Sequence, residues 1–353
     1  GRDGSEFSSP MIYLDNAATS WPKPESVYRT QDEFARKSAA NPGRASHRMA
    51  VGLEQAILDA RHHVARLFNA DGPARIAFTL NATDALNIAI KGVLRPGDHA
   101  VSTALEHNSV TRPLAGLAHR GVITWTRVPC GSSGVIDPAE IRKALTPKTR
   151  LVALIHGSNV TGLLQPVEEV ARIAHDAGAV FLVDASQTAG AVPIDVQALG
   201  ADLLACPGHK ALYGPQGTGV LYVRRGLDLA PYREGGTGTK SEDEHHPPEM
   251  PERLEGGTPN AVGIVTLGAG VKHIKQQGMA RIRSHELPGV TARDPKTPRG
   301  LPPRGRARGA GRPPARPAIR GRRRSCAPDP RPERAASRAR QAGHPRHGRA
   351  RLS

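Results

Sequence analysis

The residues with the clearest chemical potential lie in a glycine-rich turn, in the run CPGHKALYGPQGTG that starts at Cys206. Lys210 in this run follows an apolar stretch of strand length and stands directly after His209. A lysine in a loop is most often a solvated surface group. A lysine at the end of a strand can instead form a Schiff base with a carbonyl cofactor. The turn by itself leaves both interpretations open.

Asp184 ends the apolar run 180–183, where burial of an unpaired carboxylate would be costly. The protonated ring nitrogen of pyridoxal phosphate is a suitable partner, because a carboxylate beside it keeps the ring charged and able to act as an electron sink. The alternative is that Asp184 caps the segment that follows it, a common role for aspartate. Gln187, three residues further on, can reach the phenolate oxygen of the same cofactor.

A candidate phosphate site lies where the run FTLNATDAL, starting at Phe78, turns from a strand into a helix. The turn at Ala82 and Thr83 brings free backbone N–H groups and a hydroxyl to a helix N-terminus, which is an arrangement that binds anions. Threonine is also an ordinary N-cap residue, so the turn is a weak signal when taken alone.

Two more polar residues follow apolar runs. His107 comes after the run 99–103, and its ring can stack on a flat cofactor, although a histidine at such a place is more often structural. Asn159 comes after the run 151–155. Five strand ends thus present polar groups suited to one phosphorylated, planar, carbonyl-bearing ligand, and coincidence explains this poorly.

Seven apolar runs have the length of strands, and several are separated by helical stretches such as 84–91 and 167–176. The seven runs are 75–79, 99–103, 122–128, 151–155, 180–183, 203–206 and 220–223. This alternation predicts an α/β fold with a mostly parallel sheet and helices on both faces. Ligands of such sheets bind beyond the carboxyl ends of the strands, which is where the polar residues above stand.

The formal charge of the 353-residue chain, +17, is concentrated at its end. Residues 288–353 hold 18 Arg, one Lys and three acidic residues, a net of +16, whereas the first 287 residues are close to neutral. The charge of that larger part therefore gives no reason to expect a nucleic-acid or membrane protein. We find no apolar run of membrane-spanning length, no signal sequence, and only three scattered cysteines. These features predict a soluble cytoplasmic protein without a disulfide framework or a metal site.

The two ends of the chain differ in character from the rest. Residues 1–10 are polar and patternless, which is typical of a vector remnant or a flexible terminus. Near Leu287 an amphipathic helical pattern stops, and a stretch rich in Arg, Pro, Gly and Ala follows. A shifted reading frame in a GC-rich gene would produce this change, and a genuine basic tail is the alternative. Either form is predicted to be disordered and to bind nucleic acid only non-specifically.

Six motifs together resemble the cysteine desulfurase family, which belongs to the class V, fold-type I group of pyridoxal-phosphate enzymes. They are MIYLDNAAT from Met11, the Ala82–Thr83 turn, EHN from Glu106, DASQ from Asp184, GHK from Gly208 and GGTPN from Gly256. The resemblance runs in order over about 11–287. It implies a homodimer, with a large cofactor domain at 26–258 and a small domain built from 11–25 and 259–287, here incomplete. The tail 288–353 matches nothing in the family.

The resemblance implies roles for the residues at the reacting side of the cofactor. Lys210 would form the Schiff base, and His107 would stack on the ring and transfer protons. Asp184 would pair with the ring nitrogen, while Gln187 and Asn159 would meet the phenolate side.

The resemblance also implies a phosphate site. Thr83, His209 and the backbone around Ala82 would hold the phosphate, and Thr258 would reach the phosphate of the neighbouring subunit. The family often has serine two residues before the histidine of the GHK motif. Here that position is Pro207, so one phosphate hydroxyl is missing and weaker cofactor binding is expected.

The implied reaction converts L-cysteine to L-alanine and passes the sulfur to an enzyme cysteine as a persulfide, with a sulfur-acceptor protein as a possible partner. The attacking group must be a thiolate. The family's nucleophile lies beyond the point where this chain changes character, so we expect impaired turnover. Cys326 stands in unmatched sequence, Cys206 is expected in the core, and Cys130 in a turn. Arg44 is a candidate secondary contact for the substrate.

Two other functions remain open at this stage. A class V relative such as a selenocysteine lyase, another lyase or an aminotransferase would share every cofactor residue named above. A function of another class is nucleic-acid binding through the arginine-rich tail, which would have to survive high salt and prefer one sequence.

Overall fold

The computed structural model describes residues 12–38, 47–238 and 242–286. The described residues all belong to one compact unit, and residues 295–353 lie outside the described part. The predictions made for Arg44, for Cys326 and for the tail 288–353 also lie outside them. The boundaries expected for a large and a small domain stay a prediction.

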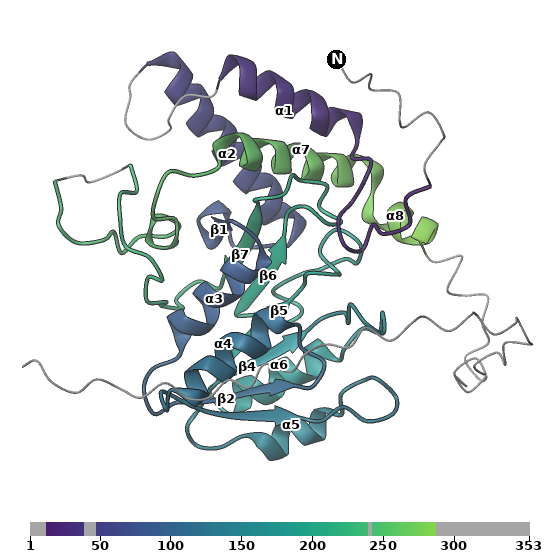
Figure 1. The fold of residues 1–353 in the computed structure, drawn as a ribbon, viewed down its shortest axis with the longest axis vertical. Helices are drawn as coiled ribbons and strands as arrows, with labels where there is room; N and C mark the ends of the chain where they lie inside the picture. The colour runs from purple at the N-terminus through teal and green to yellow at the C-terminus, as the bar shows by residue number, and fades with distance from the viewer. Residues whose placement is uncertain (1–11, 39–46, 239–241, 287–353) are drawn as a thin grey trace, which may run out of the picture. The chain divides into compact units, whose positions relative to one another are not determined.

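A seven-stranded sheet forms the centre of the described part (Figure 1). Its strands are β1 (Ile76–Thr79), β2 (His99–Thr103), β3 (Thr124–Val128), β4 (Thr149–Ile155), β5 (Val180–Asp184), β6 (Leu203–Pro207) and β7 (Gly219–Val223), in the order β1-β7-β6-β5-β4-β2-β3. Each of the seven predicted runs overlaps one of these strands, so the prediction of an α/β fold is confirmed.

The directions of the strands determine where the polar residues at the strand ends lie. The pairs β2–β3, β2–β4, β4–β5 and β5–β6 are parallel, whereas β7 runs antiparallel to both β6 and β1. Because β7 reverses direction relative to both neighbours, β1 points the same way as β6. The carboxyl ends of all strands except β7 therefore meet at one edge of the sheet.

Eight α-helices belong to the described residues: α1 (Glu25–Lys37), α2 (Arg48–Leu67), α3 (Ala82–Val93), α4 (Asn108–His119), α5 (Pro138–Ala144), α6 (Val167–Asp176), α7 (Ala261–Gln277) and α8 (Met279–Glu286). Short polar side chains start several of them. Asn81, Asp137 and Asn260 each accept a hydrogen bond from a backbone N–H in the first turn of α3, α5 and α7, which satisfies donors that the helix leaves free.

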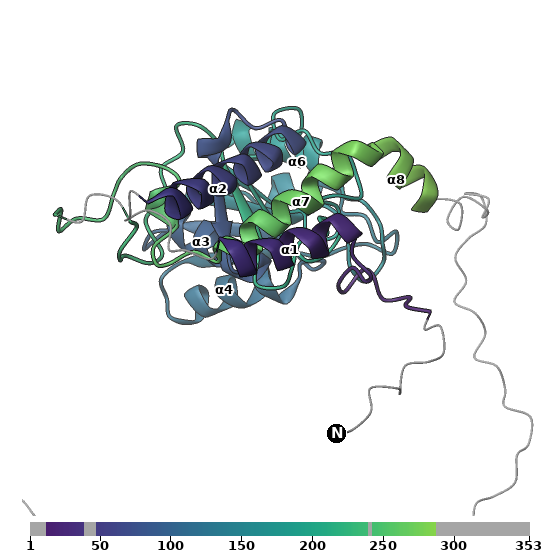
Figure 2. The same ribbon diagram turned by 90° about the horizontal axis from the view of Figure 1, so that it is seen from above.

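The helices cover both faces of the sheet because the strands are apolar on both sides. Along β4, Leu151 and Ala153 face a core shared with α3 and α4. Val152 and Leu154 face the opposite core, to which α2, α5, α6 and α7 contribute. Seen from above, α2 and α6 lie on one side and α3 and α4 on the other (Figure 2).

Helix α7 packs against both α1 and α2, and lies between them when seen from above (Figure 2). Gly268 of α7 permits the close approach to α2, because a Cβ atom at this position would lie 2.7 Å from the Cβ of Ala60. The packing brings the early part of the chain against the segment that follows Thr258. None of the described helices is long and apolar enough to cross a membrane.

Candidate active site

A pocket of about 190 Å³ opens at the edge where the parallel strands end. Eight of the nine residues expected at the cofactor line this pocket: Ala82, Thr83, His107, Asn159, Asp184, Gln187, His209 and Lys210. They lie at the end of β5 or in the segments that follow β1, β2, β4, β5 and β6, so the topology brings together residues that are up to 128 positions apart. The ninth, Thr258, lines a different pocket of about 230 Å³ beside Gly217 and Asn260.

Asp184 is the last residue of β5 and is 1% exposed. Its Oδ1 accepts a hydrogen bond from the backbone N–H of Ser186 at 3.0 Å. Its Oδ2 is buried and has no hydrogen-bond partner among the described residues. Burial raises the pKa of Asp184, while the Ser186 bonds and the charge of Lys210 oppose this effect. A buried carboxylate oxygen without a donor fits a ligand that brings a cationic N–H into the pocket.

Lys210 stands at the other side of the pocket, in the turn that follows β6. Burial lowers the pKa of its amine, and the nearby carboxylate of Asp184 works against this shift. A lowered pKa increases the fraction of neutral amine, which is the nucleophilic form. Gly208 keeps the turn tight, because a Cβ atom at this position would lie 2.1 Å from Oγ1 of Thr218.

The histidine and threonine of the pocket are joined by a serine that the sequence analysis did not single out. The hydroxyl of Ser109 lies 2.7 Å from Oγ1 of Thr83 and 2.9 Å from Nδ1 of His107. The backbone N–H of Ser109 donates to the same Nδ1 at 3.2 Å, which places the proton of a neutral His107 ring on Nε2. The only sequence signal for this role was the position of Ser109 just after the EHN motif.

His209 has a polar atom with no partner in the described part of the chain, the buried Nδ1. Burial lowers the pKa of His209, and the positive charges of Lys210 and Lys23 lower it further. Its imidazole is therefore biased towards the neutral form, which can donate one hydrogen bond to an anion.

Glu106 braces the strand ends behind the pocket. Its Oε1 accepts hydrogen bonds from Oγ1 of Thr103 at 2.7 Å and from the backbone N–H of Ile155 at 3.1 Å. Burial raises the pKa of Glu106 to about 8, and the charge of Asp184 adds to the effect. Ile155 is paired with Asp184 in the sheet, so Glu106 connects the end of β2 to the strand pair that carries Asp184. Sequence reasoning named Glu106 within a motif but gave it no role.

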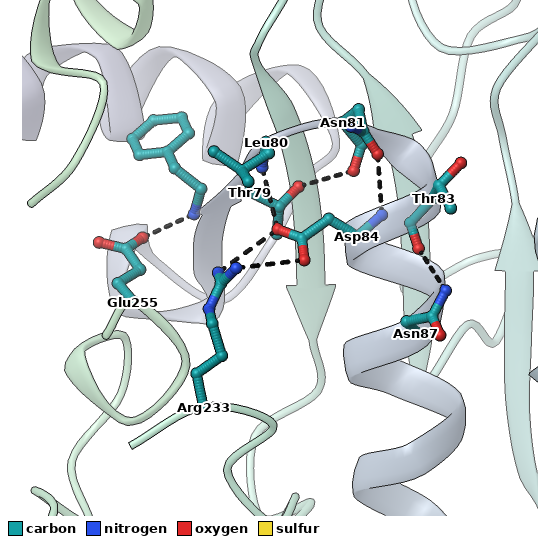
Figure 3. A network of polar contacts seen from close by, with 9 residues as sticks. Thr79, Leu80, Asn81, Thr83, Asp84, Asn87, Arg233 and Glu255 are labelled. Carbon is teal, nitrogen blue, oxygen red and sulfur yellow. Dashed lines mark hydrogen bonds and ion pairs between the residues drawn. The ribbon is translucent and has the colours of Figure 1, made fainter. Parts of the chain in front are cut away.

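Polar contacts also fix the start of α3, where the phosphate site is expected (Figure 3). Asp84 accepts a hydrogen bond from the backbone N–H of Leu80 at 3.0 Å, and Asn81 accepts one from the N–H of Asp84 at 2.9 Å. The guanidinium of Arg233 lies 3.4 Å from both carboxylate oxygens of Asp84. Nearby, the carboxylate of Glu255 accepts from the backbone N–H of Phe78. These contacts connect the turn before α3 to the segment that leads to Thr258.

The two cysteines among the described residues do not line the 190 Å³ pocket. Cys206 is buried within β6, as expected, and burial raises the pKa of its thiol. Cys130 is partly exposed, and its thiol donates to the carbonyl of Gly131 at 3.4 Å.

Known proteins resemble most of this chain in sequence and in fold. The family model described as aminotransferase class-V matches residues 12–290. A probable cysteine desulfurase of Methanothermobacter thermautotrophicus is 40% identical over 282 residues, which cover 78% of this chain and 70% of that protein. The apo structure of the cysteine desulfurase from Thermococcus onnurineus shares 36% identity with a TM-score of 0.72, covering 78% of this chain and 70% of that one. The structure of the cysteine desulfurase CsdA from Escherichia coli shares 33% identity with a TM-score of 0.69, covering 76% of this chain and 69% of that one.

The mostly parallel sheet and the solved structures that resemble it define a pyridoxal-phosphate-dependent enzyme of fold type I. The chain belongs to the class V aminotransferase family, on the branch of the cysteine desulfurases, as the resemblance predicted. Its cofactor is pyridoxal phosphate, and the unpartnered Oδ2 of Asp184 fits the ring nitrogen of that group.

Proposed function

We propose that this chain is a cysteine desulfurase, which releases L-alanine from L-cysteine and transfers the sulfur to a cysteine thiolate. The observation that carries the proposal is the pocket in which Lys210 and the unpartnered carboxylate of Asp184 stand together. Relatives and solved structures that bear this name at 33–40% identity supply the substrate. The pocket chemistry alone suits many amino acids.

Each residue of the pocket has a proposed task. Bound pyridoxal phosphate supplies an electron sink for negative charge on the substrate. Asp184 would hold the ring nitrogen in its protonated form, and Lys210 would hold the cofactor and move a proton through its amine. His107 would lie against the ring, with its Nε2 proton available because Nδ1 is occupied by Ser109. Gln187 and Asn159 would hold the phenolate side.

The phosphate is proposed to bind at the N-terminus of α3, where Ala82 and Thr83 line the pocket and the helix has free backbone N–H groups. His209 would add one donor from its neutral ring. Pro207 lines the same pocket without a hydroxyl, so cofactor affinity is expected to be lower than with serine at this position.

The active enzyme is proposed to be a homodimer. Thr258 is exposed and lines a separate pocket, so it does not share the pocket of its own Lys210. A second copy would bring its Thr258 to the phosphate, which is the arrangement that the resemblance implies. We propose that a further protein accepts the sulfur.

The sulfur carrier is proposed to be a thiol other than those of Cys206 and Cys130. Cys206 is fully buried, and its raised pKa leaves little thiolate. Cys130 lies outside the pocket. We therefore expect sulfur transfer, and not cofactor binding, to limit turnover.

The test is the visible absorption spectrum of the purified protein with pyridoxal phosphate, recorded before and after adding L-cysteine, with alanine measured by amino-acid analysis. We expect a visible band that changes with L-cysteine, and alanine formation that increases when a thiol is added to accept the sulfur as a persulfide. The band should be lost in Lys210→Ala. It should be kept in Lys148→Ala, because Lys148 is an exposed lysine. A band that responds to L-selenocysteine but not to L-cysteine would replace the proposal with a selenocysteine lyase.

A further inference from the structure

The segment that precedes α1 lies against the turn that carries Lys210. The carbonyl of Ala17 accepts a hydrogen bond from Nε2 of Gln187 at 3.4 Å. Two residues further along, the segment places several donors on the backbone that follows β6. This segment is about 190 positions away from the turn in sequence, so the contacts are tertiary.

The donors converge on two carbonyl groups. The His209 carbonyl accepts from Oγ1 of Thr19 at 3.1 Å, from the backbone N–H of Ser20 at 3.2 Å and from Nζ of Lys23 at 3.3 Å. The Lys210 carbonyl accepts from Oγ of Ser20 at 3.0 Å. The peptide between these residues is therefore held on its oxygen side by a separate part of the chain.

Lys23 completes the arrangement. Its ammonium donates to Oγ of Ser20 at 3.0 Å, to the carbonyl of Ser20 at 3.2 Å and to the carbonyl of His209. An ammonium has three protons, so all of them have acceptors here. Oγ of Ser20 accepts from Lys23 and lies 3.0 Å from the Lys210 carbonyl and 3.2 Å from the His209 carbonyl, so its single proton is donated to one or the other end of the same turn.

The surroundings of Lys23 differ from those of a solvated surface lysine. The side chain is half-buried, and burial lowers the pKa of its amine. Ser20 is 5% exposed. Burying part of a charged group is unfavourable unless its donors are satisfied, so this geometry ties the charge of Lys23 to the position of the turn.

We propose that Lys23 is a positioning residue, whose ammonium acts through Ser20 to fix the His209–Lys210 peptide and so to present the Lys210 amine to the cofactor. The inference rests on the proposed role of Lys210. It adds an electrostatic consequence, since burial lowers the pKa of His209 and the charges of Lys210 and Lys23 lower it further.

Three variants separate the parts of this proposal. Lys23→Met removes the charge and the donors, Lys23→Arg keeps the charge, and Ser20→Ala removes only the hydroxyl that connects Lys23 to Lys210. Lys148→Met is the matched control, because Lys148 is exposed and its hydrogen bonds to Thr146 and His99 are made by its backbone atoms. The folding of each variant is first checked by thermal unfolding without cofactor.

The first measurement is the dissociation constant of pyridoxal phosphate, from titration of the visible band. We expect Lys23→Met to bind about tenfold more weakly, which corresponds to about 1.4 kcal/mol. Ser20→Ala should also bind more weakly, Lys23→Arg should recover part of the loss, and Lys148→Met should match the wild type. A folded Lys23→Met protein with wild-type affinity would overturn the proposal.

The second measurement is the pH titration of the His209 ring by NMR in the cofactor-free protein. The midpoint should rise in Lys23→Met, because a positive charge that opposes protonation is gone, and should stay unchanged in Ser20→Ala and Lys23→Arg. An unchanged midpoint in Lys23→Met would contradict the proposal even if no cofactor binds. A wild-type protein without a visible band would instead contradict the role of Lys210.

Discussion

Arg61 and Glu255 are 194 positions apart in the chain and form a two-pronged ion pair, with 2.6 Å between Nη1 and Oε1 and 2.9 Å between Nη2 and Oε2. Arg61 belongs to α2 and also donates to the carbonyl of Ile76. Glu255 also accepts from the backbone N–H of Phe78 and directly precedes the GGTPN motif. One ion pair thus connects α2, the edge strand β1 and the segment that leads to Thr258.

Removing the charge of Glu255 should therefore destabilise the protein. The two side chains are only 8% and 18% exposed, so Glu255→Gln leaves a buried guanidinium without a counter-charge. We expect the free energy of unfolding to fall by about 3 kcal/mol. Glu140→Gln is the control, since its ion pair with Lys143 is exposed and should contribute less than about 1 kcal/mol. Urea unfolding followed by circular dichroism compares them, and equal losses would contradict the structural role of the pair.

Glu106 predicts a dependence of stability on pH. Its pKa is raised to about 8 in the folded protein, against 4.5 for an exposed glutamate, so the folded state keeps a proton that the unfolded state loses. Glu106 therefore contributes most to the free energy of unfolding below about pH 4.5, and this contribution is lost as the pH rises towards about 8. Glutamine cannot ionise, so the free energy of unfolding of Glu106→Gln should rise by at least about 1.4 kcal/mol relative to that of the wild type between about pH 5 and about pH 8. A stability difference that does not change across this range would show that Glu106 is ionised when buried.

Gly190 lies against the backbone that follows Lys210. It has a φ of +91°, and a Cβ atom there would lie 2.4 Å from the carbonyl oxygen of Ala211. Gly190→Ala should cost about 1–2 kcal/mol for the backbone and a further 1–3 kcal/mol for the clash, and should weaken cofactor binding by displacing the turn.

Gly178→Ala is the matched control for this prediction. Gly178 has a φ of +69° and open space where a Cβ atom would lie, so only the backbone cost applies. Thermal unfolding and cofactor titration of both variants provide the comparison. Equal effects on cofactor binding would contradict the contact between Gly190 and the turn.

The two cysteines within the described residues should react very differently. Native protein treated with iodoacetamide should be modified at Cys130, which is partly exposed, and protected at Cys206, which is buried with a raised pKa. Mass spectrometry of tryptic peptides, with and without urea, measures both sites. Modification of Cys206 before unfolding would make it a candidate sulfur carrier after all.

The sequence was sufficient to predict the strands and the pocket, for an identifiable physical reason. Runs such as 151–155 and 180–183 are apolar on both faces, which is typical of central strands. Asp184 and Lys210 could be placed together because the carboxyl ends of parallel strands share one edge.

Other features depend on contacts that no local pattern encodes. An apolar run such as 220–223 is the same in either direction, so the antiparallel orientation of β7 was not predicted. Helix α7 is apolar around most of its surface, and two of its glycines reflect tertiary contacts and not a helical pattern: Gly268 meets α2, and Gly270 meets the backbone at Leu212 and Tyr213. The roles of Ser109 and Glu106 come from partners 26 and 49 residues away, and that of Lys23 from a partner 186 residues away.

The proposal that Lys210 binds pyridoxal phosphate is tested by identifying the lysine that carries the cofactor. The protein is incubated with pyridoxal phosphate, reduced with borohydride, digested and mapped by mass spectrometry. We expect a phosphopyridoxyl group on Lys210 at near-full occupancy, and a marked loss of this label in Asp184→Ala. A label on Lys23 or spread over exposed lysines, with the Lys210 peptide unmodified, would contradict it.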